Sequence, residues 1–167
     1  MNEFIVDWII HSVIGDEYIG GMCDMHSHGL NKYGSRELQV VLCAEAYVAI
    51  IYKVGQLIKN NGLKLHAGMF IENLFDDDTL LRIDDAVDCN GEPIWRLIIP
   101  DVDYKFPEES DEYPYFLQTY SPLAANAKDN IKELIRHRGE DFHPFKFKNG
   151  ERVPCFKWML ERAWNRT

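Results

Sequence analysis

The 167-residue sequence lacks the patterns that mark a secreted, membrane-spanning or nucleotide-binding protein. Met1 is followed by Asn2 and Glu3 rather than by a basic segment, and no apolar run approaches the roughly 18 residues of a membrane span. Neither G-x-G-x-x-G nor G-x-x-x-x-G-K-[ST] occurs, which disfavours nucleotide binding of those kinds. The four cysteines form no C-x-x-C pair. An even number of cysteines is compatible with two disulfides, but we expect a cytoplasmic protein with free thiols.

Positive charge is also scarce. The chain has 18 lysines and arginines against 27 acidic residues, a formal net charge of −9. This balance argues against nucleic acid or an anionic membrane as the main partner, and it leaves open a basic peptide, a cation or a basic protein. Apolar residues are plentiful at 46%, so the chain can bury a core without disulfides or a metal.

Hydrophobic periodicity predicts an α+β fold, with a mixed, mostly antiparallel sheet covered by one main helix. That helix has apolar residues at helical spacing and ends at Asn61-Gly62. Asn90-Gly91 favours a type I′ turn in a hairpin. Ser121 is the expected N-cap of a second helix, with Pro122 at its first position. The expected elements are strands at 3–15, 22–29 and 37–42, the main helix at 44–60, a short strand or extended passage at 63–70, the hairpin of 80–87 and 93–99, and the second helix at 122–138.

The last 29 residues differ from the rest of the chain. Residues 139–167 carry six basic and four acidic side chains, a balance of +2, and their aromatic and basic residues alternate. We therefore expect a single domain over residues 1–138 and a C-terminal extension over 139–167 packed on it. A hairpin at Asn149-Gly150 followed by a short helix would suit this extension. Its anchors, to the core or to a second subunit, would be Phe145, Phe147, Phe156 and Trp158.

Two stretches resemble a known family. "HSHGLNKYGSREL", beginning at His26, and "WRLIIPDVDYKFPEE", beginning at Trp95, are similar in order and spacing to the bacterial family named domain-of-unknown-function 4262. The resemblance runs from about Val6 to Gln118 and leaves the tail outside. It implies a small soluble bacterial α+β domain but no activity. This chain departs from the family pattern at His26 and His28, so a metal site there would belong to a subgroup.

The densest group of potential ligands lies in "CDMHSHGLNKYG". In a strand, Asp24, His26 and His28 point to one face, and these are ligand types for zinc or for a facial-triad iron site. Alternate residues on a regular strand lie about 6.6–7 Å apart, so a bend near Gly29 would be required. His66 is the most plausible further ligand. The alternative is a polar sheet face whose histidines bond to neighbours or solvent.

Other candidates carry less specific patterns. Cys23 alternates to the face opposite the histidines, which disfavours an activated thiolate. The acidic clusters lack EF-hand spacing and are typical of solvated surfaces. Asp101 and Asp103 follow a buried-looking strand, and strand ends often carry ligand-contacting groups. Arg96 lies on that strand and would pair with an acid. These three residues are our candidate binding residues.

Two classes of function follow from the sequence. The first is a non-enzymatic binding or interaction module without a cofactor, such as an immunity-like protein that masks a basic partner. The second is a metal-dependent hydrolase or oxygenase that uses Asp24, His26 and His28 with zinc or iron. A small-molecule pocket between helix and sheet is a third hypothesis. A homodimer stays open in each case.

Overall fold

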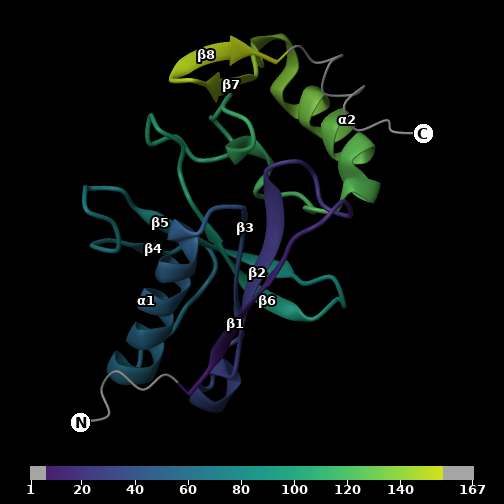
Figure 1. Cartoon of the computed structure of the whole chain (residues 1–167). Coiled ribbons are helices and arrows are strands. Elements are labelled where there is room, and N and C mark those ends of the chain that lie inside the picture. Colours follow the sequence, from purple (N-terminus) through teal and green to yellow (C-terminus); the bar gives the residue numbers. More distant parts are fainter. Residues whose placement is uncertain (1–6, 156–167) are drawn as a thin grey trace. The chain divides into compact units, whose positions relative to one another are not determined.

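A six-stranded mixed sheet is the largest element of the computed structural model, which describes residues 7–155. Three of its strand pairs are antiparallel, β1–β2, β4–β5 and β5–β6, and β3 and β6 run parallel (Figure 1). The prediction of an α+β fold with a mixed, mostly antiparallel sheet is therefore confirmed. In spatial order the strands are β1 (Ile9–Val13), β2 (Met22–His28), β3 (Leu38–Leu42), β6 (Pro93–Ile98), β5 (Leu81–Val87) and β4 (Phe70–Ile71).

The chain divides into two compact units. The first extends to residue 13 and resumes over residues 24–98, and the second comprises residues 14–23 and those from 99 onward. No boundary between these units falls at residue 138. The predicted domain over residues 1–138 with a C-terminal extension over 139–167 stays a prediction. Neither described helix is both long and apolar enough to cross a membrane. No disulfide joins the four cysteines, all of which lie in the described part of the chain.

Helix α1 (Ala46–Asn61) packs on β3 in the first unit. Its buried side chains include Ile50, Ile51, Val54 and Ile58, which recur at helical spacing. Gly62 ends the helix in a left-handed conformation, and its N–H donates to the carbonyl of Leu57. The predicted helix at 44–60 is therefore confirmed to within two residues.

The hairpin of β5 and β6 is confirmed, but its predicted type I′ turn is wrong. A type I′ turn needs positive φ at both central residues. Gly91 has φ 80°, whereas Asn90 is not among the described residues with positive φ. The Asp88 carboxylate instead accepts hydrogen bonds from the N–H groups of Asn90 and Glu92, at 2.8 and 2.9 Å. The Asp88 side chain thus shapes a five-residue connection.

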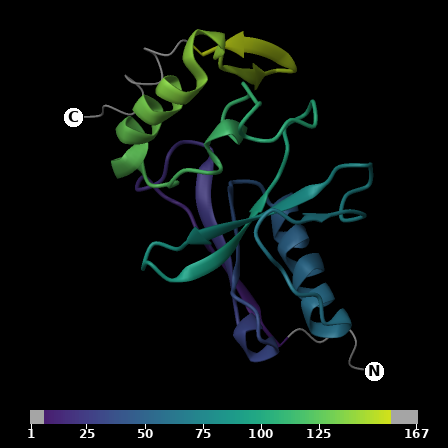
Figure 2. The same cartoon turned by 180° about the vertical axis from the view of Figure 1, so that it is seen from behind.

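The second unit contains a hairpin whose turn has the primed conformation. β7 (Phe145–Lys148) and β8 (Glu151–Pro154) are joined by Asn149 and Gly150, with φ of 53° and 80°. Figure 2 shows this yellow hairpin after helix α2 (Ala127–Arg138), to which a 3₁₀ turn (Gly139–Asp141) and a short link connect it. The short helix expected after it, with Phe156 and Trp158, lies outside the described residues, as do residues 3–6 of the first expected strand.

Helix α2 begins later than predicted. Pro122 is not its first residue, because Leu123 is extended and pairs with Tyr18 in an isolated β-bridge. A turn of 3₁₀ helix (Ala124–Asn126) then leads into α2. Ser121 does accept hydrogen bonds at this point, from Leu123 N–H and from Asn126 Nδ2. The helix ends before Gly139, as the sequence predicted.

Candidate metal centre

Three histidines from two neighbouring strands lie together on one face of the sheet. The antiparallel register places His11 of β1 opposite His26 of β2, and Ile9 opposite His28. One ligand atom from each of His11, His26 and His28 lies within 4.8 Å of the others. His11 and His28 are exposed, and the His26 side chain is 19% exposed. The group therefore opens to solvent on one side.

The spacing of His26 and His28 is close to that of two ligands on one metal. Their Nε2 atoms lie 3.0 Å apart. Two nitrogens bound to zinc at 2.0–2.1 Å in tetrahedral geometry would lie about 3.4 Å apart. A bound metal therefore requires these two rings to separate only slightly, while His11 moves inward. The approach of the two rings does not need the predicted bend near Gly29, because β2 pairs with β1 in continuous register as far as His28 and the two ring nitrogens already meet.

Asp24 lies behind His26. Its Oδ1 atom is 3.0 Å from His26 Nδ1 and also accepts a hydrogen bond from Gln39 Nε2, at 3.0 Å. A carboxylate in this position orients the imidazole and holds the Nδ1 proton, which leaves Nε2 to bind a metal. Among the described residues, Asp24 is not in the group whose ligand atoms converge.

A buried polar chain fixes Asp24. Gln39 of β3 is 1% exposed, and its Oε1 accepts a hydrogen bond from Arg96 Nε of β6, at 2.9 Å. Burial lowers the pKa of Arg96, while the negative charges of Asp24 and Asp84 raise it. The guanidinium charge therefore compensates that of Asp24 through Gln39. The His26 ring is held by residues from three adjacent strands.

The Nδ1 contact of His26 also determines how the pair holds its protons. If Nδ1–H of neutral His26 donates to Asp24, its Nε2 is an acceptor, and His28 donates Nε2–H across the 3.0 Å contact. Metal binding then requires the His28 proton to leave Nε2, as neutral histidine permits by carrying it on Nδ1. In that tautomer His26 presents Nε2 to a metal, whereas His28 must first move its proton to Nδ1.

Of the four predicted ligands, the structure brings together His26 and His28. His66 lies outside the group, is exposed, and has its Nδ1 atom 3.2 Å from the carbonyl oxygen of Ala67. Sequence reasoning missed His11. The sequence placed His11 in a strand of alternating side chains that precedes the strand of His26. Alternation does not fix the register between two strands, and that register pairs His11 with His26.

The candidate binding residues Asp101 and Asp103 organise a loop in the second unit. The Asp101 carboxylate accepts hydrogen bonds from Asp103 N–H at 2.8 Å, from Lys105 N–H at 3.0 Å, and from the Ser110 hydroxyl. Asp103 forms an ion pair of 2.6 Å with Arg152. Both carboxylates therefore have structural partners, and Arg96 belongs to the polar chain behind His26.

Glu112, beside that loop, gives a pH-dependent prediction. Burial raises the pKa of Glu112 above its ordinary value of 4.5, despite the Val102 N–H that its Oε1 accepts, and Asp101 and Asp103 raise it further. The folded state then binds the proton more tightly, so this contribution to stability is present at low pH and is lost as pH rises through the raised pKa. We expect Glu112→Gln to raise the denaturation midpoint at pH 7.5 but not at pH 4.

Urea denaturation at both pH values measures this effect, with the exposed Glu109→Gln as the matched control. Both variants remove one acidic residue, so a general relief of the negative net charge would raise both midpoints equally. Equal midpoints for the wild type and Glu112→Gln at pH 7.5 would contradict the prediction.

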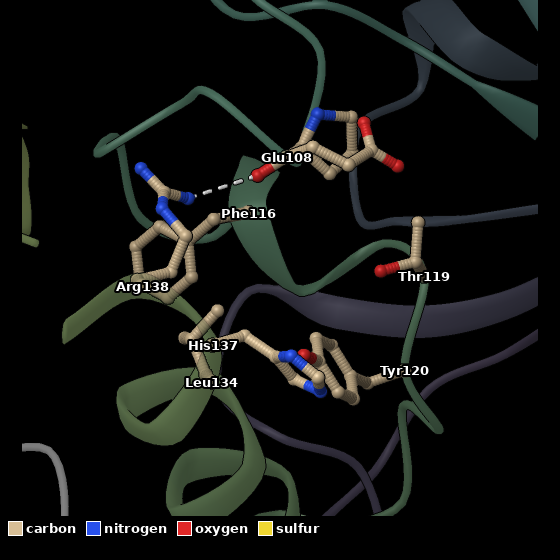
Figure 3. Close-up of a pocket in the computed structure, with 8 residues that line it drawn as sticks. Glu108, Phe116, Thr119, Tyr120, Leu134, His137 and Arg138 are labelled. Carbon is tan, nitrogen blue, oxygen red and sulfur yellow. Dashed lines mark hydrogen bonds between the residues drawn. The ribbon is translucent and has the colours of Figure 1, made fainter.

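A cavity of about 380 Å³ lies in the second unit, between helix α2 and the segment from Pro107 to Tyr120. Phe116 and Leu134 contribute apolar side chains to its lining, and Thr119, Tyr120 and His137 contribute polar ones (Figure 3). The Arg138 guanidinium at its edge donates to the carbonyls of Pro107 and Ser110 and to Asp111. These three contacts tie the Arg138 guanidinium to the backbone and to an acidic side chain of the same unit. All of the cavity's lining residues lie between Pro107 and Arg138 of the second unit, so it is not the hypothesised pocket between helix and sheet.

No family model, curated protein or solved structure matches this chain in the comparisons made.

Proposed function

We propose that this protein binds a divalent transition metal through His11, His26 and His28. The observation that carries the proposal is the convergence of three imidazoles to within 4.8 Å, with Asp24 orienting one of them. Imidazole nitrogens suit zinc, copper, nickel and iron, and an all-nitrogen set at this spacing suits tetrahedral zinc. Zinc is therefore the metal that we propose.

Three histidine ligands without a carboxylate favour one of the two proposed enzyme classes, the hydrolase, over the other, the oxygenase. Three protein ligands leave one zinc position for water, the arrangement of catalytic zinc sites, and zinc makes such a water more acidic. A metal-dependent hydrolase would use this open position. An iron oxygenase of the facial-triad type needs a carboxylate ligand. Asp24 is engaged by His26 and Gln39, which favours the hydrolase over the oxygenase.

The interaction module remains a second proposal. It is supported by the net charge of −9 and by the Asp76-Asp77-Asp78 run, in which all three residues are exposed. A basic partner, as for an immunity-like protein of the bacterial cytoplasm, would bind there with salt-sensitive affinity. Membership of the domain-of-unknown-function 4262 family also stays a proposal, which rests on the two stretches of sequence that resemble it. The family resemblance does not conflict with a zinc site in the first unit, whereas the interaction module as predicted has no cofactor.

Zinc binding is tested by titration against a chromophoric zinc indicator. We expect one zinc per chain, and an affinity about a hundredfold lower in His28→Ala and in His11→Ala, because each loses a ligand. His66→Ala is the matched control and should bind zinc as the wild type does, since His66 lies outside the group. Equal zinc affinity in all four proteins would overturn the proposal.

Asp24→Asn tests the orienting contact. Loss of a carboxylate that orients a ligating histidine lowers metal affinity about 10–100-fold. We expect that range for Asp24→Asn in the same titration, with zinc still bound by the three histidines. Because Asp24 is buried, the free energy of unfolding is measured alongside by urea denaturation. An unchanged zinc affinity in a folded Asp24→Asn protein would assign Asp24 a purely structural role.

A further inference from the structure

Strand β1 forms one edge of the six-stranded sheet, and its edge is unusually well suited to pairing. All five of its residues pair with β2 in continuous register, from Ile9 opposite His28 to Val13 opposite Asp24. The described edge strand on the other side, β4, has only two residues. An edge strand presents a row of backbone N–H and C=O groups to any further strand. β1 therefore offers a longer template than β4.

β1 lacks the features that protect edge strands. Natural edges carry charged side chains, proline or bulges that prevent pairing with another chain. The sequence of β1, "IIHSV", contains neither a charged residue nor proline, and its pairing with β2 has no bulge. Ile9 is 56% exposed and Val13 is 37% exposed. Two apolar side chains thus stand exposed on either side of His11.

We propose that β1 is the docking edge for a second copy of this chain, in an antiparallel pairing centred on His11. In that register Ile9 lies opposite Val13 of the second copy, and the reverse, so the pattern is complementary to itself. Each β-branched pair on one face stabilises such a contact. The chain as a whole carries a charge of −9, which repels a second copy, and β1 is a segment where the copies meet without charge.

This pairing brings the two histidine groups together. Directly opposite residues in antiparallel strands have Cβ atoms about 4.5–5.5 Å apart, so His11 of the second copy lies beside His11 of the first. Because His11, His26 and His28 lie on one face, the second copy's His11 is within reach of the fourth zinc position, where it would replace the water that a hydrolase uses, so this shared ligand describes a structural zinc. Zinc therefore strengthens the dimer. This consequence rests on the proposed zinc site, whereas the pairing itself rests only on the strand edge.

The full chain is tested by sedimentation equilibrium over a range of concentrations, in EDTA and in zinc chloride. We expect a monomer–dimer equilibrium in EDTA and a dimer dissociation constant about tenfold lower in zinc. Ile9→Lys should shift the protein to monomer while each chain still binds zinc in the indicator titration. Val87→Lys, a matched change at a residue 58% exposed in β5, should leave the dimer intact.

Cross-linking tests the register. In a Cys43→Ser/Cys89→Ser background, which removes the two exposed thiols, His11→Cys should form an inter-chain disulfide on mild oxidation. Val13→Cys should not, because the two Val13 positions lie four residues out of register, about 14 Å apart.

The outcomes separate the two proposals. A monomer at every concentration in both buffers overturns the docking edge, as does a dimer that survives Ile9→Lys or cross-links through Val13→Cys. A dimer in EDTA that zinc does not tighten, in a protein that binds zinc in the titration, supports the pairing and overturns the shared ligand. A dimer in EDTA from a protein that binds no zinc supports the pairing and overturns the proposed function.

Discussion

Gly55→Ala is expected to destabilise the protein by about 2–3 kcal/mol, although alanine in a helix interior is normally favoured over glycine by about 1 kcal/mol. A Cβ atom at Gly55 would lie 2.3 Å from Cζ2 and 2.5 Å from Cη2 of Trp8. Trp8 is 2% exposed and its ring packs against Tyr52, so it has little room to move. Urea denaturation measures the loss, and equal or greater stability of Gly55→Ala would contradict this packing.

A double-mutant cycle shows whether the Trp8 ring is the cause. Trp8→Phe removes the ring atoms that an added Cβ would meet, and it also removes Nε1, which has no hydrogen-bond partner among the described residues. The variant alone should lose stability because it leaves a cavity. In that background Gly55→Ala should cost nothing or stabilise the helix, so the two changes are strongly non-additive. Additive effects would place the strain elsewhere.

Local sequence patterns were sufficient to predict helix α1 and the facing of the side chains on β2. The apolar spacing of α1 and the Gly62 stop gave that helix, and strand alternation correctly placed Asp24, His26 and His28 on one face. The role of Asp24 was not accessible in this way. It is set by Gln39 and Arg96, and the hydrogen bond between those two residues spans 57 positions in the sequence. Contacts at that separation depend on strand order, which periodicity does not encode.

The two Asn-Gly pairs show that a short sequence pattern also fails to fix the conformation of a turn. Asn149-Gly150 has positive φ at both positions and closes a two-residue hairpin loop, whereas Asn90-Gly91 lies in a five-residue connection. The difference lies in Asp88, whose carboxylate accepts two backbone N–H groups of its own loop. A dipeptide signal thus predicts that a hairpin exists, and a neighbouring side chain decides its geometry.

Glu37→Ala is the second large effect that we expect, with a loss of about 2–4 kcal/mol in the free energy of unfolding. The Glu37 carboxylate accepts hydrogen bonds from the N–H groups of Gly29, Leu30 and Asn31 and from the Ser27 hydroxyl. Alanine leaves all four donors without that acceptor. Glu37→Gln should cost about half as much, because its amide keeps one accepting oxygen. Urea denaturation measures both losses.

The same variant separates the stability of the turn between Gly29 and Glu37 from zinc binding at the proposed site. In "HSHGLNKYGSREL" the structure joins Gly29, Leu30 and Glu37 into one hydrogen-bonded turn. The exposed His28 contributes little to that turn. We therefore expect His28→Ala to lower zinc affinity but to change unfolding in EDTA by less than about 0.5 kcal/mol. Glu37→Ala should do the reverse, losing stability while the folded protein still binds zinc. A large stability loss in His28→Ala, or none in Glu37→Ala, would contradict this separation.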